Sequence, residues 1–169
     1  MRQSLEISPT QYGGLARWLF PSMKDILFLA YLFAPLMGSS SASLGDSDTG
    51  WHIRNGEQIL KTLSLPREDY FSYSAHGRSW FAWEWLSDVM MAIIHRYAGL
   101  NGIVVWANIT FAITFTLLFV WALKRGGNIF MAVILSGLAG FAASIHWLAR
   151  PHLFTMLLLL VWYIFLERF

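Results

Sequence analysis

The sequence contains no cysteine and few charged residues. Without cysteine it has no disulfide, no thiolate nucleophile and no cysteine-ligated metal site. Charged residues make up 13% of the 169 residues, against roughly 25% in soluble domains. The net charge of +2 and the lack of a basic run give no indication of nucleic-acid binding. These shortages point away from a soluble enzyme of ordinary composition.

What the sequence does contain is long apolar stretches. Hydrophobic residues make up 56% of the chain, and nine tryptophans and thirteen phenylalanines suit the interfacial belts of a membrane protein. A helix needs about 20 residues to cross the hydrocarbon core of a bilayer. The sequence therefore predicts an all-α membrane protein with about four transmembrane helices. The candidate spans are 26–44, 102–123, 128–149 and 152–166.

The N-terminal segment 1–24 carries Arg17 and Lys24 ahead of the first span and has no small-residue cleavage site. By the positive-inside rule we expect this segment to be cytoplasmic. The first span is then a retained signal anchor. The rest, 25–169, is expected to form one transmembrane domain in the inner (plasma) membrane.

The segment 83–98 has two interpretations. Its uncharged stretch is only six residues long, and Glu84 and Asp88 lie one helical turn apart. This pattern fits an amphipathic helix that lies at the membrane interface. An interfacial helix places Lys124 and Arg125 in the cytoplasm, whereas a spanning helix places them outside. The positive-inside rule favours the interfacial interpretation.

This topology predicts an outer or periplasmic loop, 45–101, between the first and second spans. The loop contains amphipathic juxtamembrane helices, one of them over about 49–63 with an apolar stripe. It lies on the same side of the membrane as the turn at 150–152. The expected stripe consists of Ile53, Ile59, Leu60 and Leu63.

Small and polar residues recur inside two of the spans. Small residues four apart allow close helix contact in lipid, and they are Ala132, Ser136, Gly140 and Ser144. The polar residues of 102–123, for which we expect interhelical hydrogen bonds, are Asn108, Thr110, Thr114 and Thr116.

The first candidate site is acidic. Asp46 and Asp48 follow the first span, and His52 shares a helix face with Asp48 because the two are four residues apart. A carboxylate near a low-dielectric boundary can act as a general base, and two carboxylates with a histidine can hold Mg²⁺ or Mn²⁺. The alternative is structural: Asp48 is a helix N-cap and Asp46 a solvated loop acid.

The second candidate is Arg150, with His146 one turn before it and His152 two residues after it. The planar fork of an arginine suits a phosphate, so Arg150 could bind a lipid phosphate. The alternative is that Arg150 extends to the headgroups while Pro151 opens the next helix.

An aromatic cluster lies over 80–85. It could anchor the loop to the membrane or bind a ring or prenyl chain. The nearby Pro66–Asp69 segment is predicted to be a turn. Arg67, His76 and Arg78 could also contact phosphate.

The order of these features resembles the N-terminal part of the GT-C superfamily of membrane glycosyltransferases, and in particular bacterial members related to protein mannosyltransferases and aminoarabinose transferases. The matching residues are Asp46, Asp48, Trp51, His52, Gly56, Pro66, Asp69, Phe71, Ser72, Trp80, Glu84, Trp85, Leu86, Arg150, Pro151 and His152. Relatives often have Asp-Glu where this chain has Asp48 and Thr49.

The resemblance implies transfer of a sugar from a polyprenyl-phosphate donor to an unknown acceptor on the outer face. It implies that Asp48 is the catalytic base or a metal-binding group, with Asp46 second, and that the chain is the front of a longer transferase. The residues expected to bind substrate are Arg150, His152, His52, Glu84, Trp85 and Arg78. The expected metal ligands are Asp46, Asp48 and His52.

Two other functions fit parts of the pattern. One is a non-catalytic membrane module or assembly subunit whose loop binds a partner. The other is a small transporter or lipid-binding protein that uses Arg150 and His146 as an intramembrane polar site. The charges gather near one interface instead of lining a path at mid-membrane, which argues against a transporter.

Overall fold

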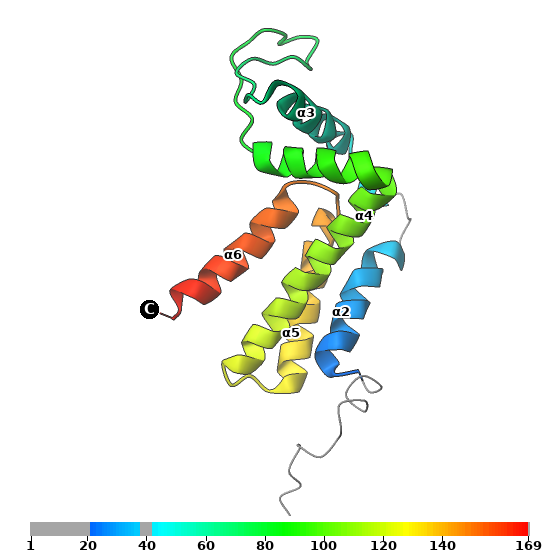
Figure 1. Cartoon of the computed structure of the whole chain (residues 1–169). Coiled ribbons are helices and arrows are strands. Elements are labelled where there is room, and N and C mark those ends of the chain that lie inside the picture. Colours follow the sequence, from blue (N-terminus) through cyan, green and yellow to red (C-terminus); the bar gives the residue numbers. More distant parts are fainter. Residues whose placement is uncertain (1–20, 38–41, 169) are drawn as a thin grey trace, which may run out of the picture.

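The structure is a computed structural model that describes residues 21–37 and 42–168. In these ranges it contains helices and loops, with one isolated bridge between Glu68 and Ser79 and no strand. The predicted all-α class is therefore confirmed, while the predicted cytoplasmic segment lies almost wholly outside the described residues. The helices shown in Figure 1 are α2 (Met23–Phe33), η1 (Ala34–Met37), η2 (Ala42–Leu44), α3 (Asp48–Thr62), α4 (Trp85–Lys124), α5 (Ile129–Ala142), η3 (Ala143–His146) and α6 (His152–Leu166).

Helix α4 changes direction at Gly99, where φ is 62° and ψ is −161°. Only glycine adopts this backbone region without strain. The break divides α4 into a cross arm, 85–98, and a long arm, 100–124. In Figure 1 the cross arm lies across the end of the helical bundle, while the long arm runs beside α2 and α5. The segment predicted to be an interfacial helix is thus a helix set at an angle to the bundle.

Helix α3 lies against the cross arm because Gly56 has no side chain. A Cβ atom at Gly56 would lie 2.0 Å from the Asp88 carbonyl oxygen and 2.8 Å from the Ala92 Cβ. Of the four residues of the predicted apolar stripe, Ile53 and Ile59 are buried, whereas Leu60 and Leu63 are exposed. Helix α3 ends at Thr62, so Leu63 lies beyond its last turn.

The long arm, α2 and α5 pack around Tyr31, which contacts Phe111 and Phe115. The Tyr31 hydroxyl lies 3.0 Å from Ser136 Oγ, and both residues are buried. A Cβ atom at Gly140 would lie 3.1 Å from the Tyr31 ring. The small residues of α5 therefore permit close helix contact, as predicted.

The prediction of interhelical hydrogen bonds was wrong for all three threonines. The buried Thr116 hydroxyl has no hydrogen-bond partner among the described residues. The Thr110 hydroxyl donates to the Trp106 carbonyl oxygen and the Thr114 hydroxyl to that of Thr110, at 2.9 and 2.8 Å. Each bond stays within α4, because a threonine hydroxyl readily reaches the carbonyl four residues earlier.

Two helices of the described ranges are long and apolar enough to cross a membrane. They are Trp85–Lys124, with a mean hydropathy of 2.2, and Ile129–His146, with a mean hydropathy of 1.9. Helix α6 is apolar but has only 15 residues. Helix α2, which has 11 residues and starts at Met23, covers only the first part of the predicted span 26–44. Residues 38–41 of that span lie outside the described ranges. These helices are compatible with a membrane protein. The four-span topology stays a prediction.

Candidate functional site

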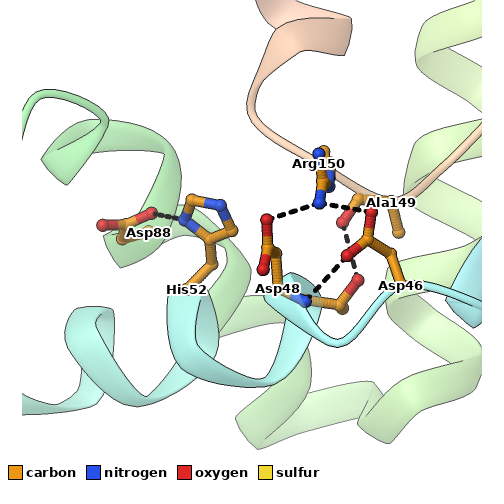
Figure 2. A network of polar contacts seen from close by, with 7 residues as sticks. Asp46, Asp48, His52, Asp88, Ala149 and Arg150 are labelled. Carbon is orange, nitrogen blue, oxygen red and sulfur yellow. Dashed lines mark hydrogen bonds and ion pairs between the residues drawn. The ribbon is translucent and has the colours of Figure 1, made fainter. Parts of the chain in front are cut away.

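The candidate site forms where the start of α3 meets the connection between η3 and α6. The Ala149 N–H donates to the Ser43 carbonyl oxygen at 2.8 Å. The Thr49 hydroxyl donates to the Ala149 carbonyl oxygen at 3.1 Å, and Ser43, Thr49 and Ala149 are all buried. These bonds hold two segments together that are about a hundred residues apart in the sequence. They place Arg150 directly over the acidic pair (Figure 2).

Arg150 forms ion pairs with both Asp46 and Asp48 through its Nη2 atom. The structure thus brings the two predicted candidate sites together into one cluster. Arg150 is paired with carboxylates, so the alternative in which it extends to lipid headgroups does not describe its position. Its Nε atom is buried and has no hydrogen-bond partner among the described residues. One donor of the guanidinium is therefore unused.

The two carboxylates have different surroundings. Asp46 Oδ1 accepts a hydrogen bond of 2.9 Å from the Asp48 N–H, and this bond, followed by the Arg150 guanidinium, lowers the pKa of Asp46. The Asp46 side chain is 14% exposed, whereas that of Asp48 is 42% exposed. The alternative in which Asp48 is a helix N-cap and Asp46 a solvated loop acid was wrong. Ser47 is the N-cap of α3, and Asp46 is ion-paired and hydrogen-bonded. Asp48 is the carboxylate more accessible to a ligand.

His52 belongs to a buried polar cluster that the sequence analysis missed. Its Nδ1 lies 2.7 Å from Asp88 Oδ1, and the Asn55 amide donates to Asp88 Oδ2 at 2.5 Å. All three side chains are buried, and Asp88 and Asn55 are fully so. Two sequence signals pointed to the cluster: Asn55 follows His52 by one helical turn, and Asp88 interrupts an otherwise apolar helix.

His52 and Asp48 share a face of α3, as predicted, but they have different partners. No hydrogen bond joins them, because His52 turns its Nδ1 towards Asp88 while Asp48 pairs with Arg150 (Figure 2). The Trp51 ring lies beside that of His52, with 3.8 Å between their centroids. His52 is thus fixed in orientation from two sides.

This arrangement does not fit a divalent ion held by Asp46, Asp48 and His52. The Arg150 guanidinium already occupies the space between the two carboxylates, and His52 Nδ1 is engaged by Asp88. In the described ranges, no group of three or more histidine, aspartate or glutamate side chains is arranged to hold a metal ion. Metal dependence stays an untested prediction.

The other predicted substrate-binding residues are not hydrogen-bonded to the acidic pair in the described structure. His152 Nε2 donates to the His146 carbonyl oxygen at 3.0 Å, and the two histidine rings pack together. Glu84 is the exposed N-cap of α4, and Trp85 is exposed beside it. Arg78 is exposed in the loop, where its backbone pairs with that of Asp69. In the described structure, Glu84, Trp85 and Arg78 form no hydrogen bond or ion pair with Asp46 or Asp48. The charges of Arg150 and Asp46 both act on His152.

An apolar groove of about 460 Å³ adjoins the site, between the cross arm of α4 and α6. Pro151, the residue after Arg150, forms part of its wall. The groove lining also includes three polar residues, Glu84, Ser87 and Thr155. Its apolar lining includes Trp83, Leu86, Met90, Pro151, Phe154 and Leu158.

Comparisons of this chain with models of protein families, with curated proteins and with solved structures found no match. The site geometry therefore supplies the evidence for function.

Proposed function

We propose that this protein takes part in the transfer of a sugar from a polyprenyl-phosphate donor to an acceptor hydroxyl at the outer face of the inner membrane. The observation that carries the proposal is the convergence of Asp48, Asp46 and Arg150 on one cluster. A base for the acceptor and a cation for the leaving phosphate are the two charged groups that this reaction requires.

The Arg150 guanidinium supports the phosphate part of the proposal. Its Nη2 is shared by two carboxylates, while the buried Nε–H has no partner. A phosphate that accepts a bond from Nε would satisfy this buried donor, and charge-assisted bonds between arginine and phosphate are strong. Phosphate binding would also draw Arg150 away from Asp48, which frees that carboxylate to accept a bond from the acceptor hydroxyl.

The apolar groove supports the lipid part of the proposal. It begins beside Pro151 and follows α6 towards Leu158, so a chain whose phosphate meets Arg150 can lie along it. Burying an apolar chain is favourable by about 25 cal/mol per Å² of apolar surface. The groove and the guanidinium together suit a ligand with an anionic head and an apolar tail.

The proposed step is a direct displacement at the anomeric carbon. Asp48 accepts the proton of the acceptor hydroxyl, and the acceptor oxygen forms a bond to the anomeric carbon. The bond between that carbon and the phosphate oxygen breaks, and the electron pair leaves with the lipid phosphate. Arg150 stabilises the negative charge that develops there. Asp46 keeps Arg150 in place and remains ionised because its pKa is lowered.

The test is sugar transfer from a radiolabelled polyprenyl-phosphate sugar, in membranes from cells that express the protein. We expect Asp48→Asn to lower kcat by roughly a hundredfold or more, because general-base catalysis contributes about 10²–10⁴. Arg150→Lys keeps the charge but loses the planar fork, so we expect both a higher donor KM and a lower kcat. The control is Lys61→Gln, an exposed change on the last turn of α3 that we expect to leave transfer unchanged.

Transfer at the same rate by wild type and Asp48→Asn would exclude the catalytic role. Absence of transfer by the wild-type protein, under conditions in which it is folded and inserted, would favour the alternative of a non-catalytic membrane module.

A further inference from the structure

The loop between α3 and α4 is held in a defined conformation. Its two sides pair through the Asp69 N–H to the Arg78 carbonyl oxygen and the Trp80 N–H to the Arg67 carbonyl oxygen, both at 2.9 Å. The loop projects beyond α3 at the end of the molecule that carries the cross arm (Figure 1). The loop therefore has a defined conformation and lies outside the apolar helices.

This loop and α3 together form a pocket of about 330 Å³. The Trp51 ring from α3 and the Trp80 ring from the loop meet edge to face, with centroids 6.0 Å apart and an angle of 75° between the planes. The pocket has two aromatic walls at nearly a right angle and a polar side. It is lined by Trp51, Asp69, Phe71, Ser72 and Trp80.

The polar side of the pocket is formed by Asp69. Its Oδ1 accepts bonds from the Phe71 and Ser72 N–H groups at 2.8 and 2.9 Å, so the carboxylate and the 71–72 turn are fixed together. The Ser72 side chain, followed by these backbone bonds, lowers the pKa of Asp69. The pocket therefore offers an ionised acceptor and a hydroxyl beside the aromatic rings.

The aromatic cluster expected at 80–85 is divided by the fold. Trp80 is half-buried against Trp51, whereas Trp83 is 81% exposed and pairs with Phe81. A tryptophan that anchors a loop in a membrane would expose its ring to lipid in the way that Trp83 does. Trp80 instead builds the wall of a pocket.

We propose that the pocket between Trp51 and Trp80 binds a sugar ring. A sugar has an apolar C–H face, which packs on an indole, and a rim of hydroxyls, which bond to a carboxylate and a serine. A pocket that is mostly apolar with a few placed polar groups is the usual form of such a site. The two indole rings are nearly perpendicular. One indole can therefore pack its face on the sugar ring while the edge of the other meets the sugar hydroxyls.

The position of the pocket connects it to the proposed reaction, and this part of the inference rests on the proposed function. Trp51 follows Asp48 by three residues of α3, and side chains at this spacing are neighbours, with about 5–6 Å between their Cβ atoms. Asp48 does not itself line the pocket, but the pocket begins one helical turn from the proposed base on the same helix. The bound sugar belongs either to the acceptor or to the donor.

The test of binding uses the full chain in detergent micelles and saturation-transfer NMR with methyl α-D-glucopyranoside, methyl α-D-mannopyranoside and methyl β-D-galactopyranoside. We expect saturable binding of at least one glycoside at millimolar concentration. We expect Trp80→Ala and Asp69→Asn each to weaken it at least tenfold, where the asparagine still accepts the two backbone bonds. The matched control is Tyr73→Ala, a fully exposed aromatic of the same loop, which leaves binding unchanged.

Two results would overturn the sugar assignment. One is the absence of saturable binding of any of the three glycosides by the wild type, or equal binding by wild type and Trp80→Ala. The other is saturable binding of tetramethylammonium but of no glycoside, because an aromatic corner with a carboxylate also suits a cation. In that case the pocket is a cation site.

Measurements of both binding and transfer distinguish a failure of the sugar-binding pocket from a failure of the proposed function. Asp48→Asn should bind glycosides like wild type although its kcat for sugar transfer falls roughly a hundredfold or more. Glycoside binding without any transfer by the wild type would refute the proposed sugar transfer but not the assignment of the pocket as a sugar site. Transfer by Trp80→Ala with unchanged KM for both substrates would refute that assignment but not the proposed sugar transfer. If KM rises at least tenfold for only one substrate, that substrate carries the bound sugar.

Discussion

The imidazole of His52 and the carboxylate of Asp88 lie 2.7 Å apart, although 36 residues separate them in the sequence. Both side chains are buried, and Asn55 binds the second oxygen of Asp88. The contact joins α3 to the cross arm of α4 directly behind the acidic pair. It makes the position of His52 dependent on the packing of two helices.

The first prediction concerns this contact. Asp88→Ala leaves His52 and Asn55 buried without their partner, and we expect the free energy of unfolding to fall by about 3 kcal/mol. Glu84→Ala, one turn earlier and exposed, should change it by about 0.5 kcal/mol or less. Thermal unfolding in detergent, with an independent denaturant titration, measures both variants. Equal stability of the two would show that the buried contact contributes nothing.

The second prediction concerns the close approach of α3 and the cross arm. Gly56→Ala places a Cβ atom 2.0 Å from the Asp88 carbonyl oxygen, so the helices must separate. We expect a loss of about 2 kcal/mol or more in unfolding free energy. The control is Gly50→Ala in the same helix, where a Cβ atom meets nothing within 4 Å. That change should be neutral or stabilising by up to about 1 kcal/mol, and a stable Gly56→Ala protein would contradict the packing described.

The third prediction concerns acid stability. The pKa of Asp46 is lowered from its ordinary value of 3.8 by the hydrogen bond from the Asp48 N–H and by Arg150. A carboxyl group with a lowered pKa stabilises the fold above its unfolded pKa, and this contribution disappears as the pH falls through the folded pKa. The unfolding midpoint of wild type should therefore drop more between pH 6 and pH 2.5 than that of Asp46→Asn. Parallel pH profiles for the two proteins would show that Asp46 is not linked to folding.

The fourth prediction concerns orientation in the membrane. Ser74 lies in the loop beyond α3, and Gly126 lies in the turn between α4 and α5 at the other end of the bundle (Figure 1). The chain has no cysteine of its own, so Ser74→Cys and Gly126→Cys can be probed singly with a membrane-impermeant thiol reagent. We expect labelling of Ser74→Cys from outside intact cells, and of Gly126→Cys only after the cells are opened. Labelling of both from outside would overturn the interfacial assignment of 83–98.

The helices that build the site could be predicted because local rules set them. An acid, a small residue and an apolar spacing mark the start of α3, and the predicted helix at 49–63 agrees with Asp48–Thr62 to within a residue at each end. The apolar runs likewise predicted the long arm of α4. The lengths of the apolar runs did not predict where α2 ends. Phe33 is followed by the 3-10 helix η1, which begins one residue before Pro35.

The site itself could be predicted only in part. The predicted topology, which stays untested, placed Arg150 and the acidic pair on one side of the membrane, and the structure brings these residues into contact. The burial of Asp88 was not predicted, because an aspartate on a short amphipathic segment usually faces water. Its partners come from α3, and Gly56 alone allows that helix to approach closely enough for His52 and Asn55 to reach it.

The sequence by itself determined that the chain is helical and rich in apolar segments, because those properties follow from composition and from the spacing of residues along one chain. The tertiary structure decided that α4 turns at Gly99, that Asp46 and Asp48 share one guanidinium, and that Trp80 packs against Trp51. These relationships depend on the approach of segments far apart in the chain. Such an approach is set by steric fit and by the pairing of buried polar groups, which no local pattern records.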